Sequence, residues 1–89
     1  MKKSFAIVVF GRVQGVGFRY HTLNKASELD IRGFVRNQAD GTVYIEAEGD
    51  GVLLETFIDW CRQGPRWASV ESVELKELDL RNYDGFTVK

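Results

Sequence analysis

The chain contains one cysteine, so no disulfide can form within it. A disulfide framework is therefore excluded, and a reducing compartment is the simplest setting. No stretch approaches the roughly 20 apolar residues of a membrane-spanning helix. The apolar run that follows Lys3 ends at Phe10 without a small-residue cleavage pattern, so it is too short for a secretion signal. We expect a cytoplasmic protein without a membrane partner.

Neither sign of charge is in large excess. The 12 Lys and Arg side chains face 13 Asp and Glu side chains, which gives a formal net charge of −1. A nucleic-acid-binding domain is more often basic overall, so we expect no nucleic-acid partner. The charges are uneven along the chain, because residues 1–37 carry seven Lys or Arg against two Asp or Glu. This basic part suits a small anionic ligand.

The apolar periodicity predicts strands and helices within one small domain that covers residues 1–89. Strands are expected at residues 4–13, 31–37, 42–48 and 70–78, with a short closing strand at 86–88. Helices are expected at residues 18–29 and, ended by Gly64 and Pro65, at about 51–63. This order predicts an α+β fold, a ferredoxin-like βαββαβ sandwich. We expect an antiparallel sheet with the first and third strands in the middle and two helices on one face.

Local signals add details to three elements. Asp30 is expected to close the first helix in the left-handed conformation, which Asp tolerates better than most residues. Strict alternation in the third strand places Glu48 on its outward side, and Gly49 is expected to break that strand. Asp50 is then expected to cap the second helix. A change of phase near Ser72 predicts a bulge in the fourth strand.

A glycine-rich loop leads from the first strand to the first helix. Residues 11–19 read Gly-Arg-Val-Gln-Gly-Val-Gly-Phe-Arg. Glycines allow successive backbone N–H groups to turn toward one point, and the helix that follows adds the positive end of its dipole. Arg19 adds a full positive charge with planar, forked donors. The loop therefore predicts a phosphate site.

Two nucleotide-binding motifs do not match this loop. A P-loop requires a second glycine followed by Lys and Ser or Thr, but the fifth residue after Gly11 is Val16. A dinucleotide fingerprint built on Gly15 and Gly17 would need glycine at position 20, where Tyr20 stands. We therefore expect neither ATP nor a dinucleotide as the natural occupant.

The same loop strongly resembles the first signature of the acylphosphatase family. A second signature is similar to Gly-Phe-Val-Arg-Asn at residues 33–37, followed by Gly-Thr-Val at residues 41–43 and by Gly49. The resemblance covers nearly the whole chain. It implies a ferredoxin-like hydrolase that converts a small-molecule acyl phosphate to a carboxylate and inorganic phosphate. It also implies that no metal and no other cofactor takes part.

The resemblance implies a role for each site residue. Arg19 would bind the phosphoryl group together with the backbone amides of Gly15, Val16, Gly17, Phe18 and Arg19. Asn37 would hold the attacking water, and Thr42 is a candidate for orienting the Asn37 amide. Because a neutral amide is a poor base, we expect the substrate's own phosphate oxygens to take the proton of the water. The first and second strands should run parallel with the third between them, which brings Arg19 and Asn37 to one rim of the sheet.

Two alternatives stay open. RNA-recognition domains share the ferredoxin-like fold, and residues 32–35 faintly echo their sheet motif, but the outward aromatic residues of their central strands are missing. A non-catalytic phosphate-sensing or carbamoyl-phosphate-handling domain, detached from a larger enzyme, is the other alternative. We expect a monomer, since no long bare apolar edge strand demands a partner.

Overall fold

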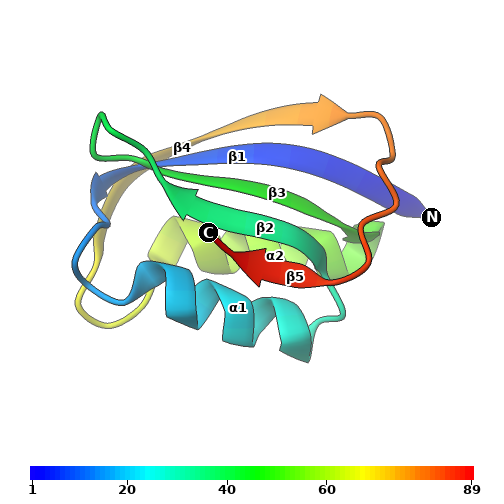
Figure 1. Cartoon of the computed structure of the whole chain (residues 1–89), viewed down its shortest axis with the longest axis horizontal. Helices are drawn as coiled ribbons and strands as arrows, with labels where there is room; N and C mark the ends of the chain where they lie inside the picture. The colour runs from blue at the N-terminus through cyan, green and yellow to red at the C-terminus, as the bar shows by residue number, and fades with distance from the viewer.

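The computed structural model describes residues 1–89 and shows a five-stranded sheet with two helices on one face (Figure 1). The strands are β1 (Lys2–Arg12), β2 (Arg32–Asn37), β3 (Val43–Asp50), β4 (Ser69–Leu78) and β5 (Phe86–Val88). The helices are α1 (Phe18–Glu28) and α2 (Gly51–Gln63). All expected elements are present in the expected order, so the ferredoxin-like α+β fold is confirmed.

The strands lie in the order β4-β1-β3-β2-β5. Because β3 is antiparallel to both β1 and β2, these two strands run in the same direction and end at the same rim. An antiparallel sheet was expected, but the sheet is mixed, because β5 pairs parallel with β2. The chain leaves β4 at the end where β2 begins and crosses that end through residues 79–85 before β5 starts (Figure 1).

One apolar core lies between the helices and the sheet. Helix α1 buries one stripe at three- to four-residue spacing, and α2 buries residues spaced i, i+3, i+4 and i+7. These helix residues are Phe18, Thr22, Ala26, Leu54, Phe57, Ile58 and Cys61. They pack on the inward side of β1, β2 and β3, which contributes Ile7, Val9, Val35, Val43 and Ile45. The helical stripes expected from the sequence are therefore confirmed.

Three of the local expectations are also confirmed. Asp30 has a φ of 55° just after α1. The Asp50 carboxylate accepts hydrogen bonds from the first-turn N–H groups of α2, at 3.1 and 3.3 Å. The register between β1 and β4 shifts after the pair formed by Phe10 and Ser72, which is the expected bulge. Neither α1 nor α2 has the length and apolar character that crossing a membrane requires.

Glu48 lies on the outward side of β3, as expected, but the sequence did not predict that it is fully buried. Residues 79–85 fold across this end of the sheet and cover it. The carboxylate accepts hydrogen bonds from the backbone N–H groups of Arg81 and Asn82, at 2.7 and 2.9 Å. Strand β3 also continues through Gly49, so the expected break at this residue is wrong. A Cβ at Gly49 would lie 2.8 Å from Ile31 Cδ1, so glycine allows the close approach of the neighbouring segment.

Candidate active site

The glycine loop between β1 and α1 leads into the N-terminus of the helix in a left-handed backbone conformation. Gly15 and Gly17 take left-handed φ values of 73° and 77°, and Gly17 is the N-cap of α1 without a side-chain cap. None of the five N–H groups of residues 15–19 donates a hydrogen bond within the chain. Free donors at a helix N-terminus are typical of sites that bind phosphate-sized anions.

Arg19 lies in the first turn of α1, beside this cradle. Its side chain is exposed, yet its Nη1 donates a hydrogen bond of 2.9 Å to the main-chain oxygen of Lys89. Lys89 is itself attached to β2, because its N–H donates to the Val35 oxygen at 2.8 Å. Sequence reasoning missed this contact, since nothing in the pattern links residues 70 positions apart. Arg19 therefore has one fixed partner and keeps its other donors available.

Asn37, the final residue of β2, lies at the same rim of the sheet as the loop. It is half-buried and pairs with Val43 across the strands. Asn37 and Arg19 line one cavity of about 260 Å³ with Gly15 and Gly17. The rest of the lining is Val13, Phe18, Tyr20 and Val88. The structure thus brings together the guanidinium, the glycine loop and a neutral amide.

The Thr42 hydroxyl group forms no hydrogen bond with Asn37. The Thr42 hydroxyl donates to the Asp40 carboxylate at 2.6 Å and accepts from Gln38 Nε2 at 2.8 Å. These two hydrogen bonds close the turn between β2 and β3. The Thr42 hydroxyl therefore stabilises this turn, which begins immediately after Asn37.

Gln14 is a site residue whose role the sequence did not reveal. Its Nε2 donates to the main-chain oxygens of Gln38 and Thr42, at 2.7 and 2.9 Å. One side-chain amide thus ties the glycine loop to the turn that follows Asn37. The signal was present, since Gln14 stands inside the loop motif, but its partners come from a turn more than 20 residues later.

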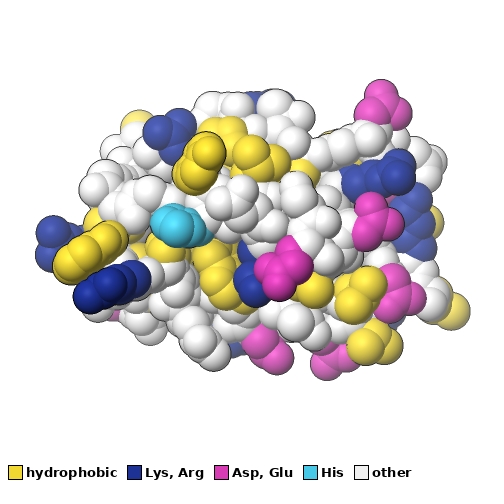
Figure 2. Space-filling model, turned by 90° about the horizontal axis from the view of Figure 1, so that it is seen from below, with side chains coloured by type: hydrophobic (Ala, Val, Ile, Leu, Met, Phe, Trp, Pro, Cys, Tyr) yellow, Lys and Arg dark blue, Asp and Glu magenta, His cyan; other side chains and the backbone are white.

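The surroundings of the loop favour anions. On the helix side of the molecule, the Asp and Glu side chains gather mainly in the half away from the loop, and few lie near it (Figure 2). No Asp or Glu side chain forms an ion pair with Arg19. No group of three or more His, Cys, Asp or Glu side chains is placed to hold a metal ion.

Comparison with known proteins decides the family. The acylphosphatase family model matches residues 5–88. An acylphosphatase of Ligilactobacillus salivarius is 46% identical over 87 residues, which cover 97% of each chain. An acylphosphatase of Archaeoglobus fulgidus is 48% identical over 82 residues, which cover 92% of each. The chain belongs to the acylphosphatase family.

A solved acylphosphatase structure agrees with this membership. The acylphosphatase of Bacillus subtilis superposes with a TM-score of 0.95 at 34% identity, covering 100% of this chain and 99% of that one. The acylphosphatase resemblance read from the two signatures is confirmed, and with it the assignment of the chain as a hydrolase.

Proposed function

We propose that the chain hydrolyses the carboxyl-phosphate bond of small acyl phosphates, with Arg19 and the glycine loop binding the phosphoryl group and Asn37 holding the water. The observation that carries this proposal is the shared cavity. Arg19, the loop residues Gly15, Gly17 and Phe18, and Asn37, whose amide has no hydrogen-bond partner in the chain, line about 260 Å³ of space. This volume suits a phosphoryl group with its attacking water.

The loop and Arg19 act on the charge of the phosphoryl oxygens. The N–H groups of residues 15–19 are fixed by the glycine conformations before substrate arrives, so they need no reorganisation during the reaction. The Arg19 guanidinium offers further donors in a plane that matches two phosphoryl oxygens. Charge that spreads over these oxygens in the transition state is thereby stabilised.

The Asn37 amide positions the nucleophile. A water held by this side chain attacks phosphorus in line with the leaving carboxylate, a bond forms between the water oxygen and phosphorus, and the phosphorus–oxygen bond to the acyl group breaks. The carboxylate leaves with the electron pair of that bond. One proton of the water stays on the new phosphate oxygen, and the other passes to a phosphoryl oxygen, so no basic side chain is needed. The acyl phosphate and water become a carboxylate and dihydrogen phosphate.

An assay with benzoyl phosphate and a metal chelator tests this function. The proposal expects turnover that the chelator does not reduce, and competitive inhibition by inorganic phosphate. In water enriched in ¹⁸O, the label should enter phosphate and not benzoate, since phosphorus is the atom attacked. Absence of turnover, or label in benzoate, would contradict the proposal.

We also propose that the chain works as a cytoplasmic monomer without a nucleic-acid partner. The exposed edge of the sheet, β4, carries charged side chains that oppose pairing with a second sheet. These are Glu71, Glu74, Lys76 and Glu77. Sedimentation equilibrium at micromolar concentration should give the mass of one chain.

A further inference from the structure

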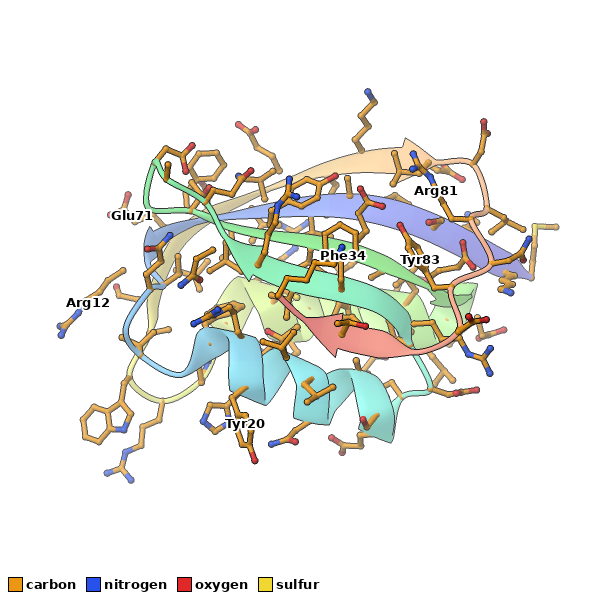
Figure 3. The ribbon with its side chains drawn as sticks, viewed as in Figure 1. Arg12, Tyr20, Phe34, Glu71, Arg81 and Tyr83 are labelled. Atoms are coloured by element: carbon orange, nitrogen blue, oxygen red, sulfur yellow. The ribbon has the colours of Figure 1, made fainter.

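Aromatic rings cluster on the open face of the sheet, opposite the helices, mostly outside the central strands β1 and β3. Phe34 of β2 lies between Tyr44 of β3 and Tyr83 of the segment before β5, with ring centroids 5.9 and 6.2 Å away. Figure 3 shows Phe34 and Tyr83 side by side on this face. Cations of the chain cover two of these rings, because Arg36 lies 4.9 Å from the Tyr44 centroid and Lys89 lies 4.0 Å from that of Phe34.

Lys89 connects this cluster to the candidate active site. Its N–H donates to the Val35 oxygen at 2.8 Å, and its main-chain oxygen accepts from Arg19 Nη1 at 2.9 Å. Its ammonium group lies over the Phe34 ring on the open face. One residue thus contacts Arg19 through its backbone and Phe34 through its side chain.

We propose that Phe34 is a positioning residue for Arg19. The ring holds the Lys89 ammonium group, and the anchored Lys89 presents a fixed main-chain oxygen to the guanidinium. The inference rests on the proposed function, because it assumes that Arg19 binds the phosphoryl group.

The need for such an anchor follows from the exposure of Arg19. A long exposed side chain samples many rotamers, and ordering it on substrate costs conformational free energy. No Asp or Glu side chain pairs with Arg19, so the Lys89 main-chain oxygen is its one fixed partner.

The anchor of Lys89 has two parts. The backbone hydrogen bond to Val35 extends the pairing of β5 with β2 by one residue. The contact with Phe34 is the second part, and it fixes the side chain of an otherwise exposed residue. A cation over an aromatic face is stabilised by about 0.5–1 kcal/mol at an exposed site. Without it, the single remaining hydrogen bond lets the end of the strand fray.

The experiment compares Phe34→Leu, Lys89→Met and the double variant with wild type. Lys89→Met keeps the apolar stem and the main-chain oxygen and removes only the charge. Each single variant should raise the inhibition constant of inorganic phosphate about three- to five-fold. The double variant should be no worse than either single variant, because both remove the same contact. Phe34→Trp should restore the wild-type constant, since Trp binds cations best.

A matched control is Lys76→Met, which removes a cation from β4 on the same face without contacting Phe34 or Arg19. Its phosphate inhibition constant should equal that of wild type. Unchanged constants in both Phe34→Leu and Lys89→Met, or additive effects in the double variant, would overturn the inference. A raised phosphate inhibition constant in Phe34→Trp would also overturn the inference, because the altered shape of the side chain, and not the lost cation contact, would then explain the result.

A second measurement separates this inference from the proposed function. The guanidinium N–H signals of Arg19 should be resolved by ¹⁵N NMR in wild type at low temperature and averaged in Phe34→Leu. If wild type does not hydrolyse benzoyl phosphate, the proposed function fails, whereas the NMR comparison still decides whether Phe34 positions Arg19. Equal averaging in both proteins would refute the positioning role alone.

Discussion

The side-chain amide of Gln14 donates to the main-chain oxygen of Gln38 at 2.7 Å and so joins the two halves of the site. The glycine loop lies on one side of this contact, and the turn after Asn37 lies on the other. A second hydrogen bond, to the Thr42 oxygen at 2.9 Å, fixes the direction of the amide. The Gln14 side chain thus fixes the glycine loop relative to the turn that follows Asn37.

Replacing Gln14 should therefore lower the rate of hydrolysis strongly and the free energy of unfolding only moderately. Gln14→Ala removes two half-buried hydrogen bonds, which lowers the free energy of unfolding by about 1–3 kcal/mol. The loop and Asn37 then move relative to each other, and a misplacement of 1 Å can reduce the rate by about 10²-fold. Steady-state kinetics with benzoyl phosphate and urea unfolding would measure the two effects. A variant that loses stability but keeps its kcat would show that this tie does not position the site.

The conformation of Gly15 should matter more than the space around it. A Cβ at Gly15 would meet no atom within 4 Å, but its φ of 73° is left-handed. Gly15→Ala should therefore cost about 1–2 kcal/mol of strain. Relaxation of φ would turn the loop N–H groups away and weaken phosphate binding.

Two comparisons isolate that effect. D-Alanine at position 15, introduced by chemical synthesis, prefers positive φ and should bind phosphate like wild type. Gly85→Ala is the matched control, since its Cβ also meets open space but its φ is not left-handed. Titration calorimetry with inorganic phosphate measures all three variants. Equal phosphate affinity in Gly15→Ala would count against the cradle.

Glu48 should make the fold sensitive to acid. Burial by itself would raise the pKa of Glu48, but the N–H groups of Arg81 and Asn82 and the Lys2 ammonium outweigh it, so the pKa lies below its ordinary value. A lowered pKa in the folded state means that the carboxylate stabilises the fold above the ordinary Glu pKa of about 4.3. This contribution is lost as the pH falls through the lower pKa of the folded state.

Glu48→Gln should lower the free energy of unfolding at pH 7 by about 1–3 kcal/mol, since one of the two N–H donors loses its acceptor. It should also flatten the loss of stability below about pH 4.3. Urea unfolding across this pH range measures both effects. The exposed carboxylate of Glu77 on β4 provides the control, and Glu77→Gln should leave the curve unchanged. If Glu48→Gln and wild type lose the same unfolding free energy as the pH falls, the role given to the Glu48 carboxylate is contradicted.

Cys61 should react only when the chain unfolds. The thiol is fully buried in the core on α2, and burial raises its pKa far above the ordinary value. Because the thiolate is the reactive form, a thiol reagent at pH 8 should label the native protein at the rate of global unfolding. Labelling in guanidinium should be complete within the mixing time. Fast labelling without denaturant would show that α2 opens locally.

Sequence reasoning predicted the parts of this molecule that local patterns determine. The helix stripes, the position of Asp30 and the shared rim of Arg19 and Asn37 follow from periodicity, turn chemistry and strand direction. The burial of Glu48 could not be predicted in this way, because residues 79–85 cover it and no local pattern shows that a distant segment will do so.

The same limit explains what was missed at the site. Gln14 donates to the main-chain oxygens of Gln38 and Thr42, and Arg19 donates to that of Lys89; a main-chain oxygen leaves no mark in the sequence. The residue types at positions 19 and 37 indicate their chemistry, since a guanidinium binds phosphate and an amide binds water. Residues that hold these groups in place have no such characteristic chemistry. Only the folded coordinates identify them.

The most direct test of the two-part site measures phosphate binding and turnover in the same variants. Asn37→Ala should bind inorganic phosphate as tightly as wild type, because the loop and Arg19 are intact, yet hydrolyse benzoyl phosphate about 10²-fold more slowly. Arg19→Ala should lose both phosphate binding and turnover. The account would be contradicted if Asn37→Ala kept a near-normal rate, or if Arg19→Ala bound phosphate like wild type.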